Sequence, residues 1–428
     1  MDFRRLLKLK GLPINKAISD LKQIRQFPDI LEWQKEQAWK IYKYHCEFNP
    51  FYQNLGKNLK ERWEDIPILS KSDLSGDYRT KLPIVDGSHK WYVENTSGSS
   101  GQPLVFAKDR YCHALAWALI EERYNRAGIA LNDLEARFYG IPLSFIGNTK
   151  ESIKDFLGNR LRFPVFDLSD YVLKKWLKIF QRKSFKYLYG YTNSMVHFAK
   201  YLEKEQIVLK KECPSITKCF VTSELCSFED QEFLQQVFGV PVVNEYGASE
   251  LGIIGFKLDN EWIASDELLY LEVVDDENRL LPDGEQGRLL CTSLFNKGTP
   301  FVRYEVGDLA SIHRANGKTW IAGLMGRLND MAILPSGKKV PGFTFYYVAR
   351  EILEKTNVVK EYRVNQLALD RIELLIVADR NLTSEETYLI EKTFETYLEK
   401  GLRIEIIRVD SLERKANGKF KHFTTEIY

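Results

Sequence analysis

The stretch at residues 94–106, ENTSGSSGQPLVF, joins a loop rich in hydroxyl groups and glycine to an apolar segment. Thr, Ser and Gly fill every position from 96 to 101, and after Glu94 no charge follows until Lys108. Glycine lets the backbone approach a ligand closely and adopt positive φ, and successive amides in such a turn form an anion-binding nest. The stretch therefore fits a phosphate-binding loop, and it fits a flexible surface turn equally well.

The two commonest phosphate-loop patterns are absent from this stretch. GxxxxGK[ST] requires a lysine that does not follow Gly101, and GxGxxG does not occur there either. Beyond the apolar segment, residues 109–127 have the pattern of a helix that ends at Gly128. The order of loop, short strand and helix therefore indicates another kind of site, and the rest of the chain must identify it.

The residues that follow predict an α/β fold. Short apolar runs alternate with amphipathic stretches, which indicates βα units with largely parallel pairing. The expected strands are 134–141, 185–189, 216–222 and 241–245, and the expected helices are 168–181, 192–203 and 227–238. From residue 269 two alternating stretches surround a turn at 282–284, which predicts an antiparallel subdomain.

The pattern of apolar and polar residues changes after Gly326, and this change predicts a second domain. We expect a helix at 347–355, two strands within 361–377, a helix at 383–398 opened by a capping box, and a strand at 402–409. A chain of 428 residues is too long for one ordinary core. The predicted organisation is a large, multi-subdomain N-terminal domain (1–326) and a small α+β domain (327–428).

The bulk composition excludes several classes of protein. Sixty-one basic residues nearly cancel fifty-nine acidic ones, so there is no electrostatic reason to expect nucleic acid as a partner. No run of about eighteen apolar residues exists, so no integral membrane segment is expected. Six cysteines without a CxxC pair and six histidines without ligand spacing predict neither a disulfide framework nor a zinc site, and they favour a reducing cytoplasm.

The basic N-terminus, residues 1–24, has apolar residues at helical spacing and leaves two interpretations open. The helix packs on the body of the protein with Lys and Arg toward water, or it lies on an anionic membrane surface. The first arrangement is common in soluble proteins, and we expect it here.

Four further stretches, taken with the hydroxyl-rich loop, resemble a known set of motifs. They are TSE at 222–224, YGASE at 246–250, FVRYEVGD at 301–308 and RKANGK at 414–419. With TSGSSGQP at 96–103 they occur in the order, and at roughly the spacing, of the adenylate-forming (AMP-binding) ligase superfamily. Over nearly the whole chain the resemblance is closest to the phenylacetate–coenzyme A ligase branch, including relatives assigned to capsular polysaccharide synthesis.

The resemblance implies an ATP-dependent, AMP-forming activation of a carboxylic acid. A carboxylate oxygen attacks the α-phosphorus of ATP, pyrophosphate leaves, and the acyl-adenylate then passes its acyl group to coenzyme A as a thioester. The implied cofactors are ATP, Mg²⁺ and coenzyme A, and the implied partner is a small-molecule carboxylic acid. Because two anions must meet, the reaction needs preorganised donors and a cation.

The phosphates and the metal are the first parts of the site that the resemblance implies. Glu250 would hold Mg²⁺, which needs few protein ligands beside phosphate oxygens and water. Gln102 stands where the family often has Lys, which removes one point charge. The loop residues that would hold the β- and γ-phosphates are Thr96, Ser97, Gly98, Ser99, Ser100 and Gly101.

The nucleoside would meet residues from three motifs. Tyr246 and Gly247 would lie beside the adenine and the acyl group, since a flat ring suits stacking and glycine leaves room. Ser223 and Glu224 would run along the adenine. Asp308 would accept hydrogen bonds from both ribose hydroxyls, a charged acceptor for two neutral donors.

The C-terminal domain would bring the last cation. Lys419 would bond the carboxylate and the α-phosphate, and a mobile domain would withdraw it for the second half-reaction. Arg327 would contact ribose or phosphate near the junction. Asn329 stands where the family usually has Asp or Lys at the hinge. The expected catalytic residues are Lys419, Glu250 and Thr96.

The acid pocket is expected from aromatic and aliphatic stretches at 138–145, 187–194 and 251–254. Their composition predicts an aryl or otherwise apolar acid, although the same stretches fit ordinary core strands. The expected substrate-binding residues are Tyr139, Phe145, Tyr246, Gly247 and Ala248.

Two alternatives to a coenzyme A ligase remain open from the sequence. In the first, the same adenylation is followed by transfer to an amine or a carrier-protein thiol. In the second, the chain binds a nucleotide without turnover, and the joint presence of Glu250 and Lys419 counts against this because pure binding needs neither. A homodimer is also left open. No GxSxG or HExxH motif supports a hydrolase.

Overall fold

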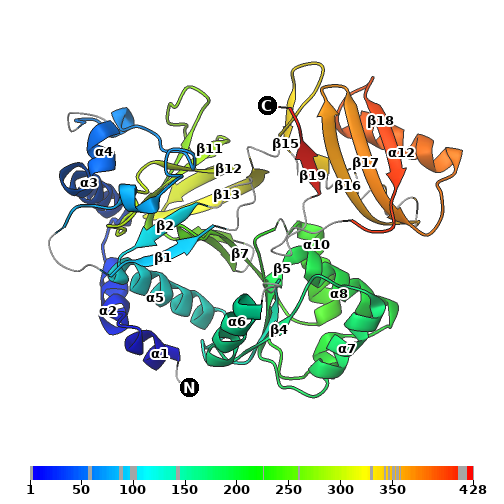
Figure 1. The fold of residues 1–428 in the computed structure, drawn as a ribbon, viewed down its shortest axis with the longest axis horizontal. Helices are drawn as coiled ribbons and strands as arrows, with labels where there is room; N and C mark the ends of the chain where they lie inside the picture. The colour runs from blue at the N-terminus through cyan, green and yellow to red at the C-terminus, as the bar shows by residue number, and fades with distance from the viewer. Residues whose placement is uncertain are drawn as a thin grey trace. The chain divides into compact units, whose positions relative to one another are not determined.

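The structure is a computed structural model of the chain. It describes residues 3–55, 60–85, 90–96, 104–140, 145–224, 226–258, 261–327, 331–341, 344–345, 348, 352, 356, 358–412 and 422–427. By its internal packing the chain divides into two compact units (Figure 1). The first contains residues 1–306 and 310–323, and the second contains 307–309 and 324–428. A functional domain boundary at 326–327 stays a prediction.

An eleven-stranded sheet forms the framework of the chain, in the order β10-β11-β12-β13-β9-β8-β7-β6-β5-β3-β4. Its parallel part comprises β3 (Glu135–Phe138), β4 (Arg160–Phe163), β5 (Tyr187–Tyr191), β6 (Lys218–Thr222) and β7 (Val242–Ala248). The other strands are β8 (Gly252–Leu258), β9 (Glu261–Ala264), β10 (Leu269–Val274), β11 (Gly287–Ser293), β12 (Tyr304–Ala315) and β13 (Lys318–Arg327). The expected antiparallel pairing of β10 with β11 is confirmed, but these strands continue the main sheet.

Helices cover both faces of the parallel strands (Figure 1). On one face α7 (Asp170–Phe180), α8 (Thr192–Lys204) and α10 (Phe228–Phe238) pack on Phe138, Leu188 and their neighbours. On the other face α5 (Arg110–Arg126) supplies Tyr124, which packs on Tyr187 and Phe220. Because successive strand residues point to opposite faces, Tyr187 and Leu188 serve different layers.

Local capping signals set where several helices begin. The Asp109 carboxylate accepts from two backbone amides at the start of α5, and Ser227 forms a capping box with Asp230 at the start of α10. Gly128, with φ of 79°, follows the end of α5 as expected. The strand expected at 185–189 lies two residues further on, at Tyr187–Tyr191.

The N-terminal helices pack on this body. They are α1 (Phe3–Leu9), α2 (Ile14–Ile24), α3 (Ile30–Phe48) and α4 (Pro50–Leu55). Helix α2 buries Ile14, Ala17, Leu21 and Ile24 and lies against α5, so the apolar stripe of the basic N-terminus is used for packing, as expected. None of the helices that the structure describes is long and apolar enough to cross a membrane.

The second unit has its own sheet and core. Strands β18 (Arg403–Arg408), β17 (Arg371–Ala378), β16 (Val359–Ala368) and β19 (Phe423–Thr425) form a four-stranded sheet in that order. Helix α12 (Ser384–Tyr397) begins with the expected capping box of Thr383 and Glu386 and buries Ile390 and Phe394 against the sheet. The helix expected at 347–355 lies largely outside the described residues. A short pair, β14 (Met331–Ile333) and β15 (Lys339–Pro341), completes the unit.

The remaining elements are short or connect the layers. They are the 3₁₀ turns Trp63–Asp65 and Tyr78–Lys81, the hairpin strands β1 (Tyr92–Asn95) and β2 (Val105–Lys108), α6 (Phe145–Leu157) and α9 (Leu209–Glu212). The segment 138–145 is therefore not one strand, since Phe145 already opens α6.

Candidate active site

The hydroxyl-rich stretch connects β1 to β2 in the sequence, and these two strands pair antiparallel. Asn95 pairs with Val105 at the last rung, and beyond it Thr96 closes the loop from both sides. The Thr96 amide donates to the Leu104 carbonyl oxygen at 2.9 Å, and the Leu104 amide donates to Thr96 Oγ1 at 2.9 Å. Both ends of the segment 97–103 are thus fixed. Ser97, Gly98, Ser99, Ser100 and Gly101 lie outside the described residues, so their predicted role stays a prediction.

The end of this hairpin that carries Tyr92 packs on helix α5. The rings of Tyr92 and His113 stack with centroids 3.8 Å apart, and Trp117 Nε1 donates to His113 Nε2 at 3.2 Å. Burial, helped by the nearby Lys108 and Lys10 charges, lowers the pKa of His113 to about 3. His113 is therefore a neutral acceptor at neutral pH, and the hairpin has a rigid support.

The YGASE motif forms the end of β7 and the turn into β8. A register shift falls between Tyr246 and Gly247, which bends the strand end. A Cβ atom at Gly247 would lie 2.5 Å from the carbonyl oxygen of Gly252. Only glycine fits there, so the glycine of this motif is required by the backbone itself. Ala248 is half-buried on the same strand end.

Glu250 is buried at the end of this turn and is held by one aromatic hydroxyl. Tyr304 Oη donates to Glu250 Oε1 at 3.0 Å, and Glu250 is 8% exposed. Tyr304 itself belongs to the FVRYEVGD motif. A buried, oriented carboxylate is a hard oxygen donor of the kind Mg²⁺ prefers. Among the described residues no group of three or more His, Cys, Asp or Glu side chains is placed to hold a metal, and a nucleotide-borne magnesium does not need one.

Lys108 joins the hairpin to the YGASE turn. Its Nζ donates to the Ser249 carbonyl oxygen at 3.0 Å, across 141 positions of sequence, and the side chain is buried. Burial lowers the pKa of Lys108, while Cys112, Glu94 and Glu250 act electrostatically in the opposite direction. The loop support and the turn that carries Glu250 are therefore one local structure.

The carboxyl ends of β3, β5, β6 and β7 bring together a second group of predicted residues. In parallel sheets this edge is where ligands bind. Ser223 follows β6 with φ of 68°, a left-handed conformation that is uncommon for serine. The Glu224 carboxylate accepts from the Asn193 amide at 2.9 Å, at the start of α8. Both residues thus have defined positions at the edge where the nucleoside is expected.

Tyr139 links this edge to a buried polar cluster. Its ring stacks on that of Tyr189 with centroids 5.7 Å apart and lies 4.2 Å from that of Tyr191, centroid to centroid. Tyr189 Oη donates to Glu245 Oε1 at 3.0 Å. Aromatic packing and one hydrogen bond therefore connect Tyr139 to the residue before Tyr246.

Glu245 is the titratable centre of that cluster. Tyr189 and Tyr124 donate to its two oxygens. Burial, together with the smaller effect of the Glu135 charge, raises the pKa of Glu245 to about 7 against these hydrogen bonds and the charge of Arg137. The Arg137 guanidinium lies over the Tyr189 ring at 4.8 Å and pairs with Glu135. The carboxyl ends of these parallel strands therefore carry polar as well as aromatic side chains.

The other predicted residues are placed less completely. Asp308 is buried on β12 directly after Gly307, whose φ is 86°. The backbone of Arg327 ends β13, and Phe145 opens α6, but neither side chain is described. Lys419 and Asn329 lie outside the described residues, and their roles stay predictions.

Several residues in this region escaped prediction from the sequence. They are Lys108, Tyr304, Glu245 and Arg137, at positions that a single sequence does not distinguish from core or surface, whereas Tyr189 lies in the predicted pocket stretch 187–194. Tyr304 had the clearest signal, because it stands inside the FVRYEVGD motif that was already selected for Asp308. Lys108 ends an otherwise apolar strand, which is a weak signal.

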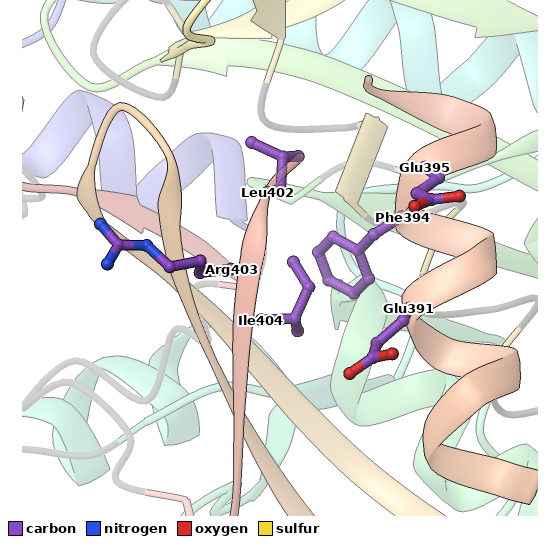
Figure 2. A pocket seen from close by; sticks show the side chains of 6 residues that line it. All are labelled: Glu391, Phe394, Glu395, Leu402, Arg403 and Ile404. Carbon is purple, nitrogen blue, oxygen red and sulfur yellow. The ribbon is translucent and has the colours of Figure 1, made fainter. Parts of the chain in front are cut away.

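A separate cleft lies within the second unit. Figure 2 shows Phe394 and Glu391 on α12 facing Ile404 on β18. The cleft measures about 370 Å³ and is also lined by Glu395, Leu402 and Arg403. None of the predicted site residues belongs to it.

Comparison with known proteins points to one superfamily, although no family model matches the chain. A phenylacetate–coenzyme A ligase from Aromatoleum evansii is 24% identical over 339 residues, 75% of this chain and 74% of that protein. Protein CapK from Staphylococcus aureus is 21% identical over 325 residues, 73% of this chain and 71% of that protein. A crystal structure of 2-hydroxyisobutyryl-CoA ligase in the postadenylation state has a TM-score of 0.69 at 18% identity and covers 92% of this chain and 89% of its own.

The fold is thus that of the adenylate-forming ligases, as the sequence predicts. Within that superfamily the sequence relatives lie in the phenylacetate–coenzyme A ligase branch and include CapK. The resemblance inferred from five short motifs is confirmed.

Proposed function

We propose that this chain is an AMP-forming carboxylate ligase that activates a small acid with ATP and transfers the acyl group to coenzyme A. The observation that carries the proposal is the junction between the hydroxyl-rich hairpin and the YGASE turn. Thr96 fixes the loop, Lys108 bonds the turn, and Tyr304 orients Glu250 in it. These contacts hold the loop support and the carboxylate of Glu250 in one local structure.

The chain's own residues then divide the work of adenylation. The loop 96–101 supplies donors to the β- and γ-phosphates, and Glu250 is the residue that would hold Mg²⁺. When bound, the magnesium ion neutralises negative charge on the phosphates. Tyr246 and Ser223 border the nucleoside at the strand ends, and Asp308 accepts from the ribose hydroxyls.

Lys419 completes the charge balance in this proposal. An ammonium group between the carboxylate and the α-phosphate lowers the repulsion of the two reacting anions. Residues 327–428 would form the domain that brings it and then withdraws it. A reducing cytoplasm is the compartment we propose, in keeping with six cysteines that form no disulfide.

Coenzyme A is the acceptor that the relatives favour. A 2-hydroxyisobutyryl-CoA ligase and an anthranilate CoA ligase share the fold, and phenylacetate–coenzyme A ligases are among the sequence relatives. Transfer to an amine or a carrier-protein thiol is the second candidate, because CapK is also a relative. Tyr139 and Tyr191 favour an aryl acid, and the Arg137 and Glu245 side chains add polar groups beneath them.

The experiment that tests this proposal is ATP–pyrophosphate exchange over a panel of aryl and aliphatic acids. We expect exchange that depends on both acid and magnesium, with coenzyme A consumed when it is added. Exchange without coenzyme A consumption would move the acceptor to an amine or carrier. Nucleotide binding without exchange for any acid would support the non-catalytic alternative.

A further inference from the structure

Lys108 is a buried cation for which the proposed reaction assigns no role. Its ammonium group bonds a neutral carbonyl oxygen, that of Ser249, and lies 5.3 Å from the Phe106 ring centroid. The carboxylates that act on it, Glu94 and Glu250, do so through electrostatic attraction. Burying an ammonium group is unfavourable unless nearby groups compensate it, so its position requires an explanation.

The neighbourhood of Lys108 connects three motifs in one local structure. Phe106, two residues earlier on the same strand, packs edge-on against Phe301, and Phe301 packs edge-on against Tyr304. Tyr304 donates to Glu250, and Lys108 donates to the residue before it. The ammonium group thus holds the backbone of the Glu250 turn, while Tyr304 holds the carboxylate.

We propose that Lys108 is a positioning residue for nucleotide binding: it anchors the Ser249–Glu250 turn to the hairpin and offsets the Glu250 charge near the incoming triphosphate. This inference rests on the proposed function of the site. It also accounts for Gln102, because a cation at the base of the hairpin partly replaces the charge that the loop lacks.

The inference is tested by ATP binding in EDTA, measured by calorimetry, so that neither turnover nor magnesium is needed. Lys108→Met keeps the apolar length of the side chain and removes both the donor and the charge. Because the Glu250 charge is then no longer offset beside the incoming triphosphate, we expect ATP to bind about tenfold more weakly. In a Glu250→Gln background the same change should weaken binding about twofold or less, because the charge that Lys108 offsets is gone.

Two further variants keep the test decisive. Lys108→Gln retains a donor and drops the charge, and we expect an intermediate loss of affinity even if the methionine variant does not fold. Lys210→Met is the matched control, because Lys210 also donates to backbone carbonyl oxygens, those of Pro214 and Ile216. It should leave ATP affinity unchanged.

The outcomes separate this inference from the proposed function. A wild-type protein with no pyrophosphate exchange would contradict the function itself. Wild-type exchange with unchanged ATP binding in Lys108→Met would overturn only the role of Lys108. An equal loss in the wild-type and Glu250→Gln backgrounds would overturn it too, because Lys108 would then act independently of Glu250.

Discussion

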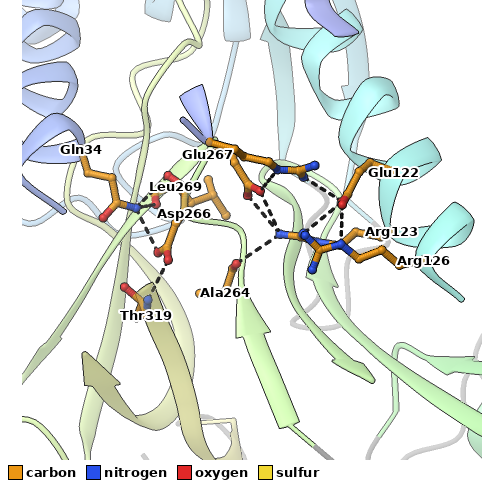
Figure 3. A network of polar contacts seen from close by, with 10 residues as sticks. Gln34, Glu122, Arg123, Arg126, Ala264, Asp266, Glu267, Leu269 and Thr319 are labelled. Atoms are coloured by element: carbon orange, nitrogen blue, oxygen red, sulfur yellow. Dashed lines mark hydrogen bonds and ion pairs between the residues drawn. The ribbon is translucent and has the colours of Figure 1, made fainter. Parts of the chain in front are cut away.

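Two clusters of charged side chains in the first unit, each with buried members, differ in how their charges are compensated. The first, which we call the α2–α5 clasp, consists of Arg25, Glu122, Arg123, Arg126 and Glu267 and is drawn in Figure 3. The second lies at the hairpin and the strand ends and contains Lys108, Glu245 and Glu250. The clasp pairs every charge directly with an opposite one, whereas the second cluster uses neutral partners.

In the clasp, each charged side chain has a hydrogen-bonding partner that carries the opposite charge. Glu267 accepts from Arg25 at 2.7 Å and from Arg123 at 3.0 Å, and Glu122 contacts the arginines as well. Burial opposes ionisation of Glu267, but Arg123 and Arg25 bring its pKa below the usual value. The clasp connects α2, α5 and the sheet, so its charges serve the fold.

In the second cluster the partners are hydroxyl and carbonyl groups. Glu250 accepts from Tyr304, Glu245 accepts from Tyr189 and Tyr124, and Lys108 donates to Ser249. Among the described residues, neutral hydrogen-bond partners orient Glu250 and Lys108 without a direct ion pair, and under the proposed function these charges would act on the bound nucleotide. We infer from this contrast that burial alone does not separate structural charges from the proposed functional ones, whereas the charge of the direct partner does.

The largest effect is expected from breaking the clasp. Arg123→Met removes a guanidinium that is 2% exposed and takes away one of the two arginines that pair with Glu267. Breaking a buried ion pair in this way destabilises a protein by about 3–5 kcal/mol. Chemical denaturation should show this loss, while the KM for ATP of the folded fraction stays unchanged.

The control for that prediction lies one turn along the same helix. Arg126 also pairs with Glu122, but its side chain is 42% exposed. Arg126→Met should lower stability by about 1 kcal/mol or less. Similar losses for the two variants would show that burial does not matter in the clasp.

The next largest effect is expected for a change that leaves the fold intact. Lys419→Ala removes the proposed reacting-site cation and should slow pyrophosphate exchange about 10²–10³-fold, with no shift in the melting temperature. Lys421→Ala removes a lysine from the same tail and serves as the control. An unchanged exchange rate in Lys419→Ala would remove the role of the C-terminal domain in adenylation.

The smallest effect is expected for Glu245, which accepts hydrogen bonds from Tyr189 and Tyr124 and whose pKa the Arg137 charge also lowers. In the folded state the pKa of Glu245 is about 7, above its ordinary value of 4.5. Between these two pH values the folded protein therefore keeps a proton on Glu245 that the unfolded chain has lost. This protonation adds to the free energy of unfolding of the wild-type protein. The contribution is fully present below about pH 4.5 and is lost as the pH rises through about 7. Glu245→Gln removes this dependence.

The measurement compares the two proteins at pH 5 and pH 8. The unfolding free energy of Glu245→Gln, relative to wild type, should rise between these pH values by an amount on the order of 2 kcal/mol. Taking the difference cancels every other titrating group. A difference that does not change with pH would place Glu245 among ordinary surface carboxylates.

Local signals in the sequence predicted the fold well where they were self-contained. Asp109, Ser227 and Thr383 each cap a helix that begins at the expected place. The motifs pointed to Glu250, Thr96 and Ser223, because each stands in a short characteristic stretch, and their roles stay predictions. Nothing local showed that the antiparallel strands β10 and β11 continue the main sheet, since strand order depends on distant pairing.

The supporting residues of the site were beyond prediction for the same reason. Lys108 meets Ser249 only after the chain has folded back over 141 positions. Glu245 and Tyr189 are an ordinary acid and an ordinary aromatic until β5, β6 and β7 align them. A single sequence carries the proposed reacting groups in its motifs, but the residues that contact them are known only from the tertiary structure.

The most direct test of the proposed reaction follows the oxygen atoms of the acid. A carboxylic acid that supports exchange is labelled with heavy oxygen in its carboxyl group and incubated with ATP, magnesium and coenzyme A. If a carboxylate oxygen attacks the α-phosphorus, one labelled oxygen must appear in the AMP that is released. Mass spectrometry of the AMP should show that label. Unlabelled AMP, or release of ADP in its place, would contradict formation of an acyl-adenylate by this protein.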